Sequence, residues 1–181
     1  MSGPGRLTTM GMGCALVLLA AAATANAQQA APRCTEDTRE CMIQAATAYL
    51  DSIVAHDASN VPLAPNVIRT EQKFITGKGE DEIRLKQKLQ PDMRGHANTR
   101  FVVDQVTNNV VAFTLLQVTG GREDPDRKTF ADDVPPEEQV PSTVHLVERF
   151  KVEKGLITEI EAIFYIERGT MDGTSNWPDP Q

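Results

Sequence analysis

Several ionisable residues gather at one expected helix-to-strand junction, within the stretch "AHDASNVPLAPNVIRTEQ" at residues 55–72. His56 stands where a helical pattern ends. Arg69 and Glu71 lie two positions apart in a strand-like run, so their side chains share one face. In apolar surroundings the pKa of a carboxylate or an imidazole moves toward neutrality, which makes the group a usable base. An arginine beside such a base can hold a phenolate or an enolate, so this combination indicates acid–base chemistry.

Further residues extend this set of candidates. Tyr49 lies deeper on the helical stripe that ends at His56, and a tyrosine hydroxyl in a dry site can donate a hydrogen bond to a developing oxyanion. The candidates for catalysis are Glu71, Arg69, His56, Tyr49, Asp104 and His145, and those for substrate binding are Arg100, Phe113 and Phe164. Ordinary roles stay open beside the chemical ones: an exposed ion pair for Arg69 and Glu71, a helix cap for His56, and core packing for Tyr49.

Two acids stand among apolar neighbours at strand spacing. Glu148 alternates with Leu146 and Phe150, and Asp104 has a valine two positions away on either side. An acid on an apolar strand face either points into the interior or lies at a strand end or a sheet edge. The sequence leaves both alternatives open for both acids.

Motifs for other chemistries are missing from the sequence. It contains no GxGxxG or GxxxxGK[ST] for a nucleotide, no HExxH for a metal, and no GxSxG for a serine nucleophile. We therefore expect no cofactor and no metal.

A long amphipathic helix is predicted from Thr35 to about Asp57. Its apolar stripe recurs at intervals of three and four residues. The stripe consists of Met42, Ala46, Tyr49, Ile53 and His56. Pro62 and Pro65 cannot continue the helix, so it should end near Asp57.

A strand-like run follows the helix. The letters "NVIRTEQKFI" predict one strand, with Val67, Arg69 and Glu71 on the same face. Residues 79–89 are charged and fit either a short solvated helix or an irregular crossing.

The second half of the chain is rich in β-strand patterns. "TRFVVDQV" and "VVAFTLLQV" flank Asn108-Asn109, and "STVHLVERFKV" and "LITEIEAIFYIE" flank Lys154-Gly155, so two hairpins are expected. In the last strand, alternate residues from Thr158 to Ile166 form a core face. One helix followed by four to five antiparallel strands predicts an α+β fold.

The segment 119–142, between the two hairpins, is rich in proline, glycine and acids. A loop of this length is either functional or mobile. A solvated loop and a lid over a pocket both fit. The tail at residues 169–181 is expected to be irregular.

The N-terminus has the pattern of a signal peptide. Arg6 precedes an apolar run that ends in Ala25-Asn26-Ala27, which predicts removal of residues 1–27 and leaves a flexible arm at 28–33. A retained anchor is the alternative. Export implies a periplasmic or secreted protein with no membrane segment after cleavage. The remaining chain has 17 basic and 25 acidic residues, a balance unsuited to nucleic-acid binding.

Two cysteines lie beyond the predicted cleavage site. An oxidising compartment favours a Cys34–Cys41 disulfide, which would tie the N-terminal arm to the first helix. Two free thiols are the alternative.

The stretches "YLDSIVAHDASNVPLAPNVIRTEQ" and "ERFKVEKGLITEIEAI" resemble the nuclear-transport-factor-2-like superfamily, in the style of its ketosteroid-isomerase-like and SnoaL-like polyketide-cyclase-like members. The resemblance covers residues 34–168, although the segment 119–142 is longer than the superfamily's usual loop. It implies a cone in which a strongly bent antiparallel sheet wraps around N-terminal helices, with an apolar pocket at the open end. It also implies a homodimer through the outer face of the sheet.

Reactions in this superfamily are generally cofactor-free, and many members only bind ligands. The resemblance therefore implies a lyase or isomerase acting by acid–base chemistry on a hydrophobic, aromatic small molecule. One such reaction is the release of formaldehyde from lignin-derived diaryl compounds. The alternatives are a non-catalytic periplasmic binding or accessory protein, and a structural dimer module. No catalytic motif of the isomerase maps onto this chain residue by residue.

Overall fold

The computed structural model describes residues 34–120, 124 and 126–173. Two helices and six strands follow one another in the order α1 (Arg39–Ala55), β1 (Leu63–Glu71), β2 (Phe74–Lys78), α2 (Glu80–Lys88), β3 (Met93–Asp104), β4 (Asn109–Val118), β5 (Ser142–Glu153) and β6 (Leu156–Arg168). Two short 3-10 helices, Phe130–Asp133 and Pro136–Glu138, lie between β4 and β5. The predicted signal peptide, the arm and Trp177 of the tail fall outside the described residues.

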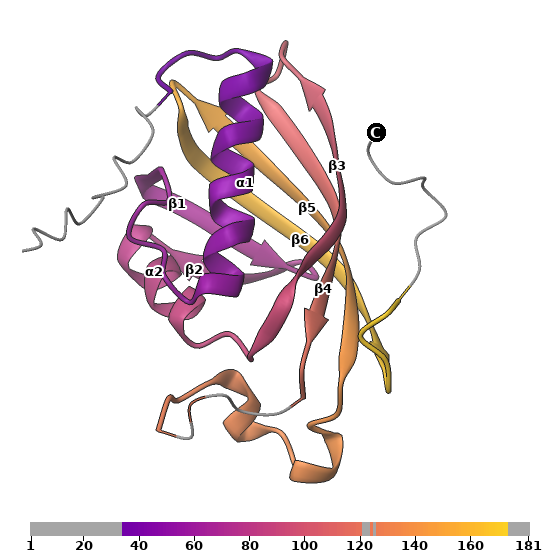
Figure 1. The fold of residues 1–181 in the computed structure, drawn as a ribbon. Coiled ribbons are helices and arrows are strands. Elements are labelled where there is room, and N and C mark those ends of the chain that lie inside the picture. Colours follow the sequence, from indigo (N-terminus) through magenta and orange to yellow (C-terminus); the bar gives the residue numbers. More distant parts are fainter. Residues whose placement is uncertain (1–33, 121–123, 125, 174–181) are drawn as a thin grey trace, which may run out of the picture. The chain divides into compact units, whose positions relative to one another are not determined.

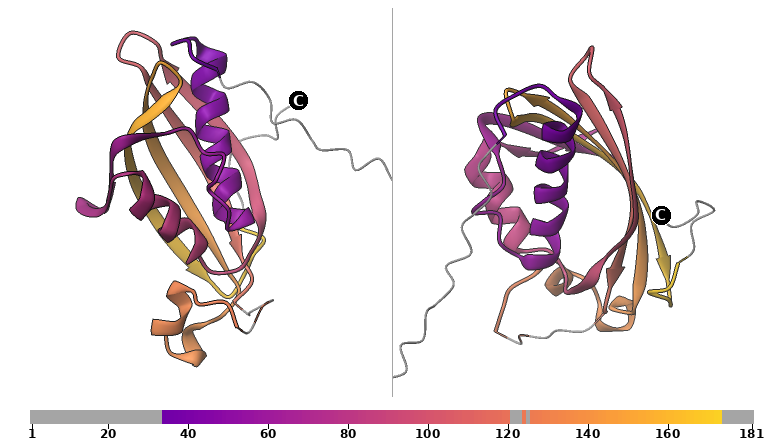
Figure 2. Two further views of the ribbon diagram at one scale, coloured as in Figure 1. Left: turned by 90° about the vertical axis from the view of Figure 1, so that its left-hand side faces the viewer. Right: turned by 45° about the horizontal axis from the view of Figure 1, so that its top comes forward.

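The sheet has the order β2-β1-β6-β5-β4-β3 and is curled without closing (Figure 1). Both helices lie on its concave side (Figure 2), where α1 contacts β3 to β6 and α2 contacts β1 and β2. The α+β prediction of a bent sheet wrapped around N-terminal helices is confirmed. Two details of it are wrong: there are six strands instead of four to five, and β1 pairs with β6 in parallel.

The run at residues 66–75 was expected to be one strand, but it forms parts of two. Gln72 and Lys73 adopt positive φ angles of 47° and 73° and turn β1 back onto β2. Such turns favour asparagine and glycine, so a Gln-Lys pair gives no turn signal. The predicted faces of β1 hold nevertheless, because Val67 and Arg69 are buried and Ile68 is exposed.

Helix α1 begins later than the expected Thr35, because Thr38 caps it and accepts a hydrogen bond from the Cys41 amide. It ends at Ala55, and His56 follows in the left-handed conformation. The ambiguous residues 79–89 form α2. Acids in its first turn and lysines in its last turn suit the helix dipole.

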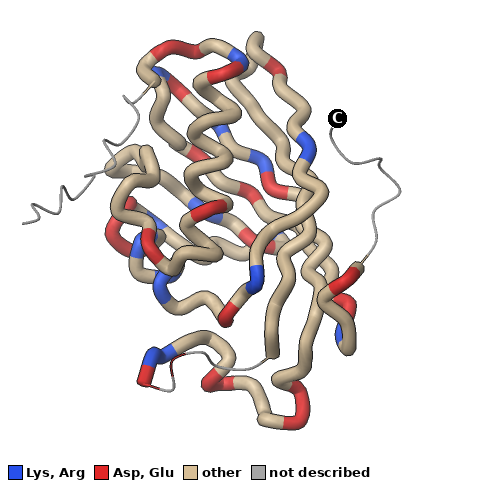
Figure 3. Tube along the Cα trace, viewed as in Figure 1, with Lys and Arg blue, Asp and Glu red and all other residues tan. Residues whose placement is uncertain are grey.

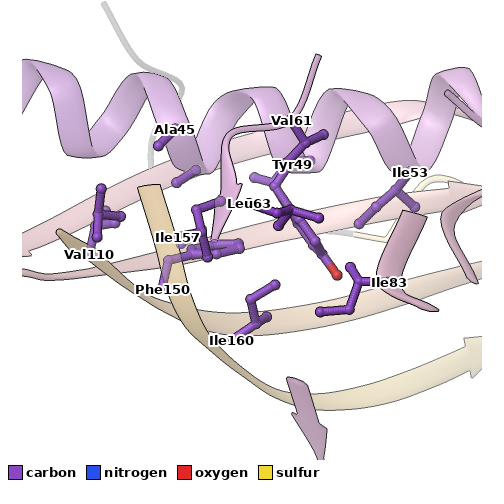
Figure 4. Packing of buried hydrophobic residues seen from close by; sticks show 14 of the residues in the cluster. Ala45, Tyr49, Ile53, Val61, Leu63, Ile83, Val110, Phe150, Ile157 and Ile160 are labelled. Atoms are coloured by element: carbon purple, nitrogen blue, oxygen red, sulfur yellow. The ribbon is translucent and has the colours of Figure 1, made fainter. Parts of the chain in front are cut away.

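The apolar stripe of α1 packs onto the inner face of the sheet. Tyr49 is fully buried, and its ring meets that of Phe150 edge-on with centroids 5.2 Å apart. Figure 4 shows the hydroxyl of Tyr49 pointing away from α1, past Ile160 and toward Ile83. Helix α1 thus places one polar atom, the hydroxyl oxygen of Tyr49, in the interior.

The N-terminal residues of the described chain pack against the β5–β6 turn. Cys34 and Cys41 form the expected disulfide, and the Lys154 amide donates to the Asp37 carboxylate. Gly155 has a φ of 73°, and a Cβ built there would lie 1.7 Å from the Cys34 carbonyl oxygen. The expected hairpin turn at Lys154-Gly155 is confirmed, and only glycine fits its second position.

Candidate functional site

A cavity of about 340 Å³ opens between the inner face of the sheet, the end of α1 and the β4–β5 connection. This volume lies in the range of pockets that bind small molecules. Most of the wall is hydrocarbon. The apolar residues from the helix and the strands are Ile53, Met93, Leu116, Val118, Val144, Leu146, Phe164 and Ile166. Phe164 therefore lies where a substrate-binding residue was expected.

Arg69 and Glu71 of β1 bring charge to this cavity. Their side chains line it and form an ion pair, with Arg69 Nη2 and Glu71 Oε1 2.7 Å apart. Arg69 also donates to the Thr76 hydroxyl of β2 at 3.1 Å. The guanidinium is buried, whereas the Glu71 side chain is 28% exposed. The predicted pair thus lies inside the cone, which decides against the alternative of an ion pair on the outer surface.

Glu148 and Tyr49 lie behind Arg69 and are fully buried. One carboxyl oxygen of Glu148 is 3.5 Å from Arg69 Nη2. Within the described chain, three side chains of this group have polar atoms without a hydrogen-bond partner. These atoms are both carboxyl oxygens of Glu148, the Tyr49 hydroxyl and Arg69 Nε. Most buried polar atoms in proteins have hydrogen-bond partners, so these residues form an unusual group.

Burial shapes the protonation of these groups. It raises the pKa of Glu148 to about 7, and Glu71 adds to the increase while Arg69 opposes it. Burial also raises the pKa of Tyr49, again opposed by Arg69. Burial alone would lower the pKa of Arg69, but Tyr49, Glu148 and Glu71 raise it above its usual value. Arg69 is thus permanently charged, whereas Glu148 changes its charge near neutral pH.

The β4–β5 connection forms the outer wall of the cavity. Its lining residues are Gly120, Phe130, Ala131, Val134, Glu138, Gln139 and Val140. Arg127 attaches this wall to the α2–β3 turn by donating to the Lys88 and Gln90 carbonyl oxygens, both at 2.9 Å, and by pairing with Asp92. At the other end, Arg168 pairs with Glu138 at 3.1 Å. The described part of this long segment therefore covers a pocket.

His56 lies at this attachment and not among the residues that line the cavity. Its Nε2 is 3.4 Å from the Asp92 carboxylate, to which Arg127 also binds. Burial and the charge of Arg127 lower the pKa of His56, and the charge of Asp92 partly offsets this decrease. His56 is the C-cap of α1 and has the left-handed conformation, so it lies beyond the last helical turn.

Four other candidates lie away from the cavity. Asp104 is exposed at the end of β3, where it accepts hydrogen bonds from Val106 and Thr107 in the turn. His145, Arg100 and Phe113 stand on the outer face of the sheet, where His145 pairs with Glu167 at 2.9 Å. Strand alternation turns these side chains away from the interior. They are not part of the site proposed below.

Glu148 is not among the residues predicted for the site, although its alternation with Leu146 and Phe150 is visible in the sequence. Strand β5 lies between β6 and β4 in the sheet, so the alternative of an edge position is wrong. The alternation can be read from the sequence. The strand order, which is needed to interpret it, cannot.

The described residues contain no cluster of three or more histidine, cysteine, aspartate or glutamate side chains that could hold a metal ion. Within the same residues no helix has the length and apolar character needed to cross a membrane. Basic and acidic residues are interspersed along the described chain (Figure 3).

Solved structures share this architecture. The epoxide hydrolase/cyclase-like enzyme SalBIII, described in pyran ring formation in the polyether salinomycin, matches with a TM-score of 0.55 and 12% identity over 74% of this chain and 100% of its own. A candidate isomerase from Bacillus subtilis matches with a TM-score of 0.53 and 9% identity over 70% and 87%. A candidate isomerase from Rhodopseudomonas palustris has a TM-score of 0.50 and 7% identity over 70% and 90%. At these identities the likeness concerns the fold.

The fold is that of the nuclear-transport-factor-2-like superfamily, as the sequence resemblance implied. The chain belongs to the family described as "Domain of unknown function (DUF8021)", whose model matches residues 35–164. No curated protein sequence matches the chain.

Proposed function

We propose that this protein is a cofactor-free acid–base enzyme, a lyase or isomerase, that acts on a hydrophobic small molecule held in the cavity. The observation that carries the proposal is the Arg69–Glu71 pair on the wall of an otherwise largely apolar cavity, with Glu148 and Tyr49 buried behind it. Side chains with displaced pKa values beside a pocket are typical of active sites. The shared fold with described enzymes adds support.

In this proposal Glu71 is the base. Its carboxylate reaches the cavity and can take a proton from a carbon next to a carbonyl group. The Arg69 guanidinium, 2.7 Å away, stabilises the negative charge that develops on the carbonyl oxygen. Return of the proton to another carbon gives isomerisation, and departure of a leaving group gives lysis. Glu148 lies behind Arg69, 3.5 Å from its Nη2, and helps to hold it in position.

Glu71→Gln tests this role. It preserves the size of the side chain and removes the base, so turnover should fall roughly 100-fold while ligand binding is kept. The measurement is turnover of a panel of apolar ketones, epoxides and phenolic diaryl compounds, with formaldehyde release followed in the diaryl reactions.

The matched control is Glu153→Gln, which removes an exposed carboxylate paired with Lys151 at the end of β5. It should leave turnover unchanged. Equal rates in the wild type and Glu71→Gln would contradict the role of Glu71. Binding without turnover of any compound would favour the alternative of a binding protein.

We also propose that the protein forms a homodimer through the outer face of the sheet. Val102, Val147, Ile163 and Tyr165 are exposed there, and Ile163 and Tyr165 are 58% and 68% accessible. Large apolar patches on a surface mark interaction sites. Ile163→Glu should weaken dimerisation roughly tenfold or more, as measured by sedimentation equilibrium. A wild type that stays monomeric at micromolar concentration would contradict the dimer.

A further inference from the structure

The charges on the cavity wall cancel in pairs. Among the described lining residues the charged ones are Arg69, Glu71, Glu138 and Arg168. Arg69 is bound to Glu71 at 2.7 Å, and Arg168 is bound to Glu138 at 3.1 Å. Each cation of the wall is therefore already neutralised by a carboxylate of the same wall.

Behind the cavity wall, a second carboxyl group lies close to Arg69. Glu148 lies 3.5 Å from Arg69, so two carboxyl groups face one guanidinium. An anionic ligand would have to displace Glu71 from Arg69, or lie beside Glu71 without a counter-charge. Both arrangements are unfavourable in a site of low polarity. A cationic ligand finds the two carboxylates that line the cavity, Glu71 and Glu138, already paired with Arg69 and Arg168.

Arg69 is a hydrogen-bond donor on the inner wall. It is 8% exposed and lines the cavity. Its guanidinium group donates hydrogen bonds and accepts none. A carbonyl, ether or epoxide oxygen can accept from Arg69 and brings no charge with it.

We propose that the cavity takes an uncharged, largely hydrocarbon molecule with a single acceptor oxygen directed to Arg69, and that it excludes the carboxylate of the same carbon skeleton. The inference rests on the cavity and residues of the proposed function, and it narrows the substrate to neutral ketones, epoxides and ethers. The inference concerns only the binding of the ligand, so a binding measurement tests it and no reaction needs to occur.

A pair of probes of nearly the same shape, one neutral and one anionic, provides the test. Methyl naphthyl ketone and the naphthoate of the same ring substitution are titrated into the full protein near pH 8 by isothermal titration calorimetry. The ketone should bind at least about tenfold more tightly, since like charges across a contact are strongly disfavoured. Glu71→Gln should narrow this preference by strengthening naphthoate binding, because it removes the cavity-lining one of the two carboxylates that face Arg69. Glu153→Gln should leave the preference unchanged.

Other outcomes would overturn the inference. The inference is wrong if naphthoate binds as tightly as the ketone, or if neither probe binds up to its solubility. It is also wrong if Glu71→Gln shows the same preference for the ketone as the wild type. The proposed function fails differently, through an unchanged rate in Glu71→Gln or the lack of any turnover. Neutral-ligand selectivity would persist in a protein that only binds.

Discussion

Glu148→Gln is expected to stabilise the folded protein by about 3 kcal/mol above pH 7, with little effect near pH 4. The physical reason is the burial of Glu148 in the middle of β5, which raises the pKa of its carboxyl group to about 7 from an ordinary value of 4.5. Glutamine has nearly the same shape and never ionises. The variant therefore avoids the cost of placing a charge in the interior.

The sign of this effect follows from proton binding. Between about pH 4.5 and pH 7 the folded protein holds a proton on Glu148 that the unfolded chain has released. Stability therefore falls as the pH rises through this window, and the full cost is present above it. Arg69, Glu71 and Tyr49 are the charged and titratable groups that act on Glu148, and all three remain in the variant.

Urea unfolding of the wild type and the variant at several pH values measures the difference in the free energy of unfolding. His56 has a lowered pKa and contributes the opposite slope below about pH 6.5, but it does so in both proteins and cancels in the difference. Glu153→Gln is the control and should show a nearly constant difference. A Glu148→Gln difference that does not change with pH would show that the carboxyl group is not buried as described.

Arg69→Met is expected to destabilise the protein by about 3 to 5 kcal/mol at pH 8, because it removes the cation from a buried group of charges. Glu148 and Glu71 then lose the guanidinium that lies 3.5 Å and 2.7 Å from them. Adding Glu148→Gln in the same chain should recover most of the loss. At pH 5 the single variant should be much less destabilised, since Glu148 can then take up a proton.

The four proteins form a double-mutant cycle, measured by chemical unfolding at pH 5 and pH 8. A large coupling at pH 8 that shrinks at pH 5 is the expected result. Additive effects of Arg69→Met and Glu148→Gln at both pH values would mean that the two side chains do not interact. Their proximity would then have no bearing on how Arg69 is held.

The residues of these two predictions differ in how well the sequence alone predicted their positions. Arg69 and Glu71 could be placed on one strand face by their spacing, and Tyr49 on the inner stripe of α1 by its helical period. Both assignments hold in the structure. Local periodicity suffices here, because each pattern spans one element whose buried face is set by its own apolar residues.

The hairpin between β1 and β2 shows the limit of local signals. Gln72 and Lys73 turn the chain with positive φ angles, although neither residue type favours that conformation. The turn is set by the pairing of β2 along the free edge of β1. Tertiary pairing has overridden the local preference.

Asp104 and Glu148 carry the same local pattern, an acid with apolar residues two positions away on either side. One ends β3 at the border of the sheet and faces solvent, and the other lies in the middle of β5 with its side chain fully buried. The sequence determined α1, the two hairpins of the second half of the chain and the faces of their strands, and it placed both acids among apolar residues. Only the tertiary structure decided which acid became unusual, because the order of the strands, set by contacts far apart in the chain, fixes which carboxyl group is removed from water.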